Sequence, residues 1–80
     1  MATVELALFA KFSARHPVPG AGRSARAFPV ADGTTLGGLV SDIGLADEQR
    51  ITFVNGRHAA DDLVLAEGDR VAIFPPIAGG

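Results

Sequence analysis

The sequence contains no cysteine, and this absence removes several kinds of site and scaffold at once. Disulfide bridges, thiolate zinc sites and cysteine nucleophiles are excluded, so this small chain must be held together by packing alone. Hydrophobic residues make up 48% of the chain, which is enough for a small core and argues against disorder. The length of 80 residues predicts a single domain over residues 1–80.

A large charge of one sign and long apolar runs are also missing. The net charge is −2, and the basic residues, one lysine and six arginines, are scattered along the chain. This distribution argues against nucleic acid and anionic membranes as partners. The apolar runs are too short for a transmembrane span or a signal peptide, so we expect a cytoplasmic protein.

Clusters of metal ligands or catalytic side chains are scarce as well. His16 and His58 are isolated from any second ligand at metal spacing, and both are expected to be plain surface residues. Asp61 and Asp62 are adjacent, so their side chains point apart and do not form a catalytic carboxylate pair. We therefore expect no metal site and no bound cofactor.

Alternation of apolar residues predicts two strands in the first half of the chain. Segment 3–12 is expected to be a strand with Phe9 on its second, half-polar face. The other face of that strand carries Val4, Leu6, Leu8, Ala10 and Phe12. After a loop rich in proline and glycine, segment 25–32 is expected to be a second strand. Pro29 lies inside it and cannot donate a ladder hydrogen bond, so this strand should lie at a sheet edge.

One helix is predicted in the middle of the chain, because four apolar residues recur at helical spacing. These residues are Leu36, Leu39, Val40 and Ile43. Thr35 is a suitable N-cap, and Gly44 is a suitable C-terminal stop. Gly37 and Gly38 fall in the first turns, where each should cost up to ~1 kcal/mol relative to alanine.

The second half predicts a hairpin, a short strand and a last strand. Asn55-Gly56 is a strong hairpin signal, segment 63–65 is a short apolar stretch, and segment 70–74 alternates. The order of elements predicts an α+β fold, a mixed sheet with one main helix on one face. That helix is expected to pack on Leu6, Leu8, Phe28, Phe53, Val71 and Ile73.

The chain closes with FPPIAGG, residues 74–80, and this segment suggests a function. Two prolines end the last strand, and two glycines leave no side chain, so a flexible, thin tail is expected over residues 75–80. The Gly80 carboxylate is then the reactive group, and a partner enzyme would activate it, most simply as an acyl-adenylate. The alternative is a frayed terminus without a role. Contact with a partner is expected through Pro75, Pro76, Ile77 and Ala78.

Residues 65–80 closely resemble the end of the MoaD/ThiS sulfur carriers, which are ubiquitin-like β-grasp proteins. VNGR at 54–57, DGTTL at 32–36 and VELALFAKF at 4–12 also fall where that family has equivalents, so the resemblance covers the whole chain. The ending looks most like that of the small subunit of molybdopterin synthase. The sequence departs from the family at 37–38, where two glycines replace the usual charged residue after the capping threonine.

The resemblance implies a carrier rather than an enzyme. An activating enzyme resembling ubiquitin E1 would use ATP to adenylate Gly80, and sulfur from a persulfide donor would displace AMP. The product would be a thiocarboxylate at Gly80, with Gly79 as its slender neighbour. The large subunit of molybdopterin synthase would consume this sulfur in molybdenum cofactor biosynthesis. The open alternatives are a sulfur carrier for thiamine or another thio-metabolite, a protein modifier, and a binding module with an inert tail.

Phe9 and Phe74 are the candidate docking residues. Alternation places both on the sheet face opposite the helix, and the first and last strands of a β-grasp sheet are neighbours. Two exposed rings, extended by Ala7 and Ala72, are typical of a docking patch beside the tail. The alternative is ordinary, partly covered surface.

Overall fold

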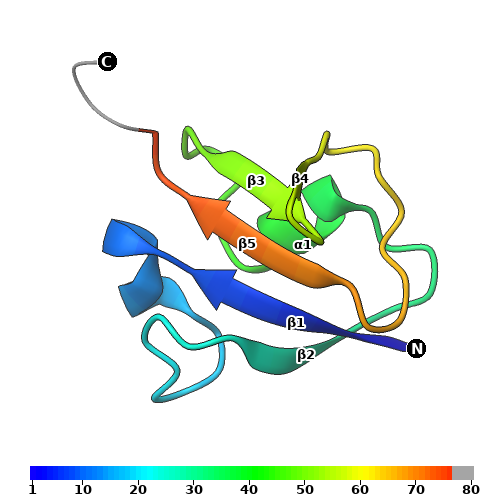
Figure 1. Cartoon of the computed structure of the whole chain (residues 1–80), viewed down its shortest axis with the longest axis horizontal. Coiled ribbons are helices and arrows are strands. Elements are labelled where there is room, and N and C mark those ends of the chain that lie inside the picture. Colours follow the sequence, from blue (N-terminus) through cyan, green and yellow to red (C-terminus); the bar gives the residue numbers. More distant parts are fainter. Residues whose placement is uncertain (77–80) are drawn as a thin grey trace.

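The structure is a computed structural model, and it describes residues 1–76. Five strands form one sheet in the order β2-β1-β5-β3-β4, in which only the β1–β5 pair is parallel (Figure 1). The helix α1 covers one face, so the predicted α+β arrangement is confirmed. The elements in chain order are β1 (Ala2–Leu8), the 3-10 helix η1 (Ala10–Arg15), β2 (Arg26–Val30), α1 (Leu36–Asp42), β3 (Ile51–Val54), β4 (Arg57–His58) and β5 (Arg70–Phe74).

One hydrophobic core lies between α1 and the sheet. Fully burying a valine, leucine or isoleucine side chain contributes roughly 1.5–3 kcal/mol, so this layer is the main source of stability. The helix and the two central strands contribute Val4, Leu6, Leu8, Leu36, Leu39, Val40, Val71 and Ile73, all of which are fully buried.

Strand β2 lies at an edge of the sheet, as Pro29 predicts. Pro29 stands opposite Thr3, whose N–H donates to Glu67 Oε1 at 2.9 Å and whose carbonyl accepts from Gly68 N at 2.8 Å. Both groups of Thr3 thus point away from β2, and the missing N–H of Pro29 costs no ladder bond. The free edge has no donor at that position, which discourages pairing with another strand.

Both ends of α1 are those the sequence predicts. The Thr35 hydroxyl accepts a hydrogen bond from Gly38 N at 3.1 Å, so the N-cap is confirmed. Gly44 has a φ of +82°, a conformation that favours glycine, and the helix ends just before it.

The first turn of α1 also forms hydrogen bonds with the backbone of residues 61–63. Leu36 N donates to Leu63 O and Gly37 N donates to Asp61 O, each at 2.8 Å, so two more free helix donors are satisfied. A Cβ on Gly37 would lie 2.9 Å from Asp61 Cβ. Glycine at position 37 therefore allows the helix to lie close to Asp61, and helix propensity alone does not reveal this requirement.

The Asn55-Gly56 hairpin is confirmed. Asn55 and Gly56 have φ values of +54° and +79°, which is the pattern of a type I′ turn between β3 and β4. The Asn55 side chain donates to Asp69 Oδ1 at 2.9 Å and accepts from Arg70 N at 2.9 Å. These two bonds fasten the hairpin to the start of β5.

Three sequence expectations about the strands and the core need correction. The first strand ends at Leu8 rather than Phe12, because the chain turns at Ala10, whose φ is +53°, into η1. Phe12 still enters the core, but by way of that 3-10 helix. Segment 63–65 forms a single bridge at Val64 rather than a strand, and the short strand is β4.

The third correction concerns Phe53, which was expected in the core. Thr52 and Val54 are the buried residues of β3, and Phe53 stands opposite Ala72 on the other face of the sheet. The pairing of β3 with β5 determines which residues of β3 point into the core and which point to the outer face. The larger apolar residues of β3, at positions 51 and 53, therefore lie on the outer face.

Candidate functional site

The candidate tail leaves from the middle of the sheet. Its last strand, β5, lies between β1 and β3 and ends at Phe74 (Figure 1). Pro75 is half-buried and Pro76 is exposed, and neither belongs to a regular element. The other predicted tail residues, Ile77, Ala78, Gly79 and Gly80, lie outside the described residues.

The two candidate docking rings lie against each other. Phe9 and Phe74 are stacked, with ring centroids 4.3 Å apart and an angle of 5° between the ring planes. Phe9 N donates to Ile73 O at 3.1 Å, which sets the register that brings the rings together. Both rings are half-buried rather than fully exposed, since each covers part of the other.

Phe53 extends this pair across the sheet, and the sequence prediction missed it. Its ring meets Phe74 edge-on at a centroid distance of 5.8 Å and meets the exposed His58 ring edge-on at 5.3 Å. Edge-on and offset-stacked rings add about 0.5–1.5 kcal/mol per pair beyond the area they bury. The pairing of β3 with β5 was the missing information, because either alternate set of β3 residues could face outward.

Small residues leave a shallow apolar hollow beside the rings. Ala7 and Ala72 are direct partners in the β1–β5 ladder, and they form part of its lining together with Phe53 and Phe74. We call this surface the sheet-face patch. It consists of Ala7, Phe9, Phe53, Ala72 and Phe74.

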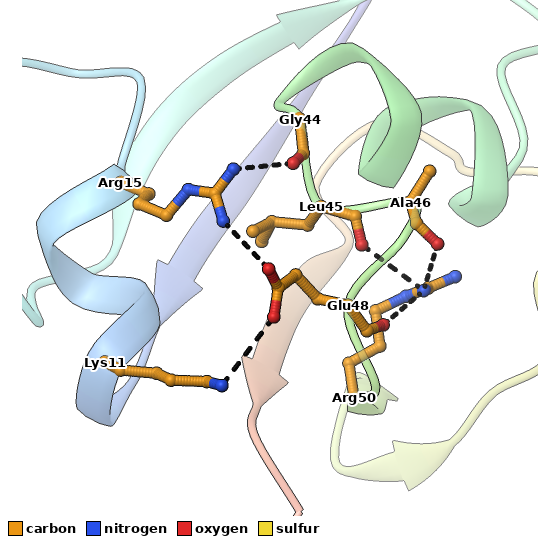
Figure 2. Close-up of polar contacts among 7 residues, drawn as sticks. All are labelled: Lys11, Arg15, Gly44, Leu45, Ala46, Glu48 and Arg50. Atoms are coloured by element: carbon orange, nitrogen blue, oxygen red, sulfur yellow. Dashed lines mark hydrogen bonds and ion pairs between the residues drawn. The ribbon is translucent and has the colours of Figure 1, made fainter.

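A polar network holds η1 against the loop after α1 (Figure 2). The Glu48 carboxylate forms ion pairs with Lys11 Nζ, at 3.6 Å, and with Arg15 Nη1, at 3.4 Å. Arg15 Nη2 also donates to Gly44 O at 2.7 Å. Exposed ion pairs are each worth about 0–1 kcal/mol, so the network serves mainly to position the loop. Lys11 and Glu48 also line a second hollow, together with Pro75 and Pro76.

Arg50 fixes the other side of the same loop. Its Nη1 donates to the carbonyl oxygens of Leu45, Ala46 and Glu48 at 3.0–3.4 Å, as Figure 2 shows. Its Nη2 forms a 2.9 Å ion pair with Asp61. The Arg50 side chain is only 14% exposed, so its role is to hold the loop in place rather than to present a charge to solvent.

His16 is a structural residue rather than the plain surface residue expected from its isolation. Its Nε2 lies 2.8 Å from Leu6 O, and its Nδ1 accepts a hydrogen bond from Val18 N at 3.0 Å. A neutral ring with its proton on Nε2 satisfies both bonds, so His16 clasps the start of the loop onto β1.

Three acidic side chains also have structural roles, because they hold neighbouring segments of the chain in place. Glu67 and Asp69 accept hydrogen bonds from backbone N–H groups, and Asp61 pairs with Arg50. Within residues 1–76 no group of three or more potential metal ligands comes together. Over the same range no helix is long and apolar enough to cross a membrane.

The fold and the patch define a class of protein. The sheet is mixed and five-stranded, one helix covers one of its faces, and the first and last strands are parallel neighbours inside it. This arrangement is the β-grasp fold of ubiquitin-like proteins. The chain belongs to the ThiS family, whose model matches residues 12–80. The resemblance to the MoaD/ThiS proteins is thereby confirmed, and the chain is a ubiquitin-like protein of the sulfur carrier or modifier kind.

Solved structures agree with this assignment. The chain is 25% identical to small archaeal modifier protein 1 of H. volcanii, over 96% of this chain and 100% of that one, with a TM-score of 0.74. It is 24% identical to a putative molybdopterin converting factor subunit 1 from Pyrococcus furiosus, with the same coverage and a TM-score of 0.76. The ubiquitin of Caldiarchaeum subterraneum shares the fold at 17% identity and a TM-score of 0.59, over 99% and 98% of the two chains. Comparison with curated proteins gives no match.

Proposed function

We propose that this chain is a sulfur carrier whose Gly80 carboxylate becomes a thiocarboxylate in molybdopterin synthesis. One observation carries the proposal. The central strand β5 ends at Phe74, inside the sheet-face patch, and passes directly into Pro75-Pro76. A partner that binds the patch is therefore positioned to receive the tail that follows.

The proposed chemistry takes place on the main chain. A Gly80 carboxylate oxygen attacks the α-phosphorus of ATP, and pyrophosphate leaves. The terminal sulfur of a persulfide then attacks the carbonyl carbon, and AMP leaves with the electron pair of the broken C–O bond. A thiol cleaves the resulting acyl disulfide, which yields the thiocarboxylate and a new disulfide on the donor. Gly79 and Gly80 leave the carbonyl open to attack, because they carry no side chain.

Partners supply the catalytic groups in this proposal. An E1-like adenylating enzyme binds ATP, a persulfide protein donates sulfur, and the large subunit of molybdopterin synthase consumes it. The Pro75-Pro76 ending favours the molybdopterin branch, because carriers of the thiamine pathway usually lack that pair.

A protein modifier is the second candidate. The 25% identity with small archaeal modifier protein 1 of H. volcanii favours it. In that case an amine on a target protein, rather than sulfur, would attack the activated Gly80 carbonyl. The products would be an isopeptide bond and AMP.

Intact mass measurement separates these candidates. After incubation with ATP, a matching activating enzyme and a sulfur source, a carrier gains the mass difference between one sulfur and one oxygen at Gly80. A modifier appears as adducts on other chains. An unchanged mass, with an activating enzyme shown to be competent on its own carrier, would contradict both proposals.

The sheet-face patch is proposed as the docking surface for the large subunit. Phe74→Arg should weaken binding at least tenfold, about 1.4 kcal/mol, because a charge replaces a central aromatic contact. Titration calorimetry measures the affinity, and a thermal melt checks that each variant folds. Val64→Arg is the matched control, since Val64 is 56% exposed and lies outside the patch. Equal affinity of both variants would remove the patch from the proposal.

A further inference from the structure

Asn55 is the only asparagine in the chain, and Gly56 follows it directly. An asparagine before a glycine is prone to spontaneous deamidation, because glycine has no side chain to hinder attack by its own backbone nitrogen. Both residues are exposed, and a Cβ on Gly56 would meet nothing within 4 Å, so water reaches the turn freely. The reaction therefore has its reactants in place at this position.

Three hydrogen bonds tie Asn55 to the start of β5. Its side-chain Nδ2 donates to Asp69 Oδ1 at 2.9 Å, and its Oδ1 accepts from Arg70 N at 2.9 Å. Its backbone N donates to Arg70 O at 2.8 Å. The adjacent residues Val54 and Val71 are ladder partners, so these bonds continue the pairing of β3 with β5. Both ends of the side-chain amide are thus held toward β5.

Deamidation requires this amide to leave both of its partners. Gly56 N attacks Asn55 Cγ and gives up its proton, the Cγ–Nδ2 bond breaks, and ammonia leaves with that proton. Water then opens the succinimide ring and yields aspartate or isoaspartate. Ring closure turns the amide toward Gly56 and moves the main chain out of the type I′ turn, in which Asn55 has a φ of +54°. Neither side-chain bond to β5 survives that movement.

We propose that Asn55 is a deamidation site whose rate is set by its contacts with β5. The amide is held away from Gly56 N while the hairpin is docked, and the reaction proceeds when the hairpin opens. The aspartate product places a carboxylate beside Asp69, and the isoaspartate product lengthens the main chain at the turn, so either product disfavours redocking. The modification thus makes a transient opening permanent. This inference is independent of the proposed sulfur chemistry, because it uses no residue of the candidate tail.

Incubation of the full chain at mildly alkaline pH tests the proposal, with the same chain unfolded in guanidinium chloride as the reference. Intact mass follows the exchange of an amide NH2 for a hydroxyl, and fragmentation assigns it to residue 55 rather than to Gln49. A methyltransferase specific for isoaspartate detects the second product. The folded chain should deamidate at least about tenfold more slowly than the unfolded chain, because two side-chain hydrogen bonds must break first.

Two variants separate this contact from general stability. Asp69→Ala removes the acceptor of Asn55 Nδ2, together with a bond from Ala66 N, and should speed deamidation of the folded protein several-fold. Glu67→Ala is the matched control, because it removes a hydrogen bond from Thr3 N in the same loop and leaves the bonds of Asn55 in place. It should deamidate at the parent rate. Guanidinium unfolding curves show that both variants are folded and give their free energies of unfolding.

Four results would overturn the proposal. They are no deamidation at residue 55 in the unfolded chain, equal rates in the folded and unfolded parent, an unchanged rate in Asp69→Ala, and equal acceleration in both variants. The last result would show that the global free energy of unfolding, rather than the contact with β5, controls the reaction. None of the four bears on adenylation or sulfur transfer, since no activating enzyme or sulfur donor is present.

Discussion

Asn55 connects two parts of the chain that are distant in sequence. Its left-handed backbone makes the β3–β4 turn, while its side-chain amide bonds to Asp69 and to the backbone of Arg70. The turn was predictable, because Asn-Gly is a local signal. The two side-chain bonds were not, because they depend on the position of β5 beside the hairpin.

The first prediction concerns this contact. Asn55→Asp should destabilise the protein by about 1–3 kcal/mol, because a carboxylate replaces the amide donor 2.9 Å from Asp69 Oδ1. Urea unfolding followed by circular dichroism measures the change. Combining Asn55→Asp with Asp69→Asn restores a donor and an acceptor and should recover most of the loss. Full stability of the single variant would show that the contact contributes nothing.

Elements built on local signals were predicted well, and those decided by tertiary contacts were not. The Thr35 cap and the Gly44 stop are local, and both are present in the structure. The left-handed Ala10 that ends β1, and the η1 helix after it, leave no mark in an alternating apolar pattern, because Phe12 is buried either way. The facing of Phe53 likewise required knowledge of the strand beside it.

The first turn of α1 gives the second prediction, because its two glycines are not equivalent. Gly37→Ala should destabilise by about 1–2 kcal/mol. Its new Cβ would lie 2.9 Å from Asp61 Cβ and 3.2 Å from Asp61 O, and this overlap outweighs a helix-propensity gain of up to ~1 kcal/mol. Gly38→Ala meets only Thr35 Oγ1 at 3.3 Å and Thr34 Cγ2 at 3.6 Å, so it should cause no loss.

Chemical unfolding of both variants, side by side, checks this difference. The sequence suggested that the two glycines weaken the helix equally, and equal changes in unfolding free energy would support that simpler view. A loss confined to Gly37→Ala would show that contact with Asp61, rather than helix propensity, requires glycine at that position.

At the scale of the molecule, the core and the candidate reactive group occupy separate parts of the chain. Within residues 1–76 the buried residues lie between Ala2 and Ile73, and neither Pro75 nor Pro76 is among them. The overall layout could be predicted, because the order of elements and the family resemblance agreed. The aromatic surface was predicted in part, since Phe9 and Phe74 follow from alternation and Phe53 does not.

The third prediction follows from that separation. Deleting Gly79 and Gly80 should abolish sulfur transfer and leave the melting temperature unchanged within error, because no described core residue is removed. Adding one alanine after Gly80 is the matched control for chain length and should abolish transfer in the same way. Differential scanning calorimetry measures the melting temperature, and intact mass measures transfer. Loss of the fold on deletion would contradict the separation.

The position of β5 has a mechanical consequence. A pull on the end of the chain loads β5 along its length, against β1 on one side and β3 on the other. The hydrogen bonds of both ladders then share the load in shear, and they must yield together rather than open one at a time. An unfolding machine that grips this end would therefore have to break both ladders together, whereas the edge strands β2 and β4 each pair with only one neighbour.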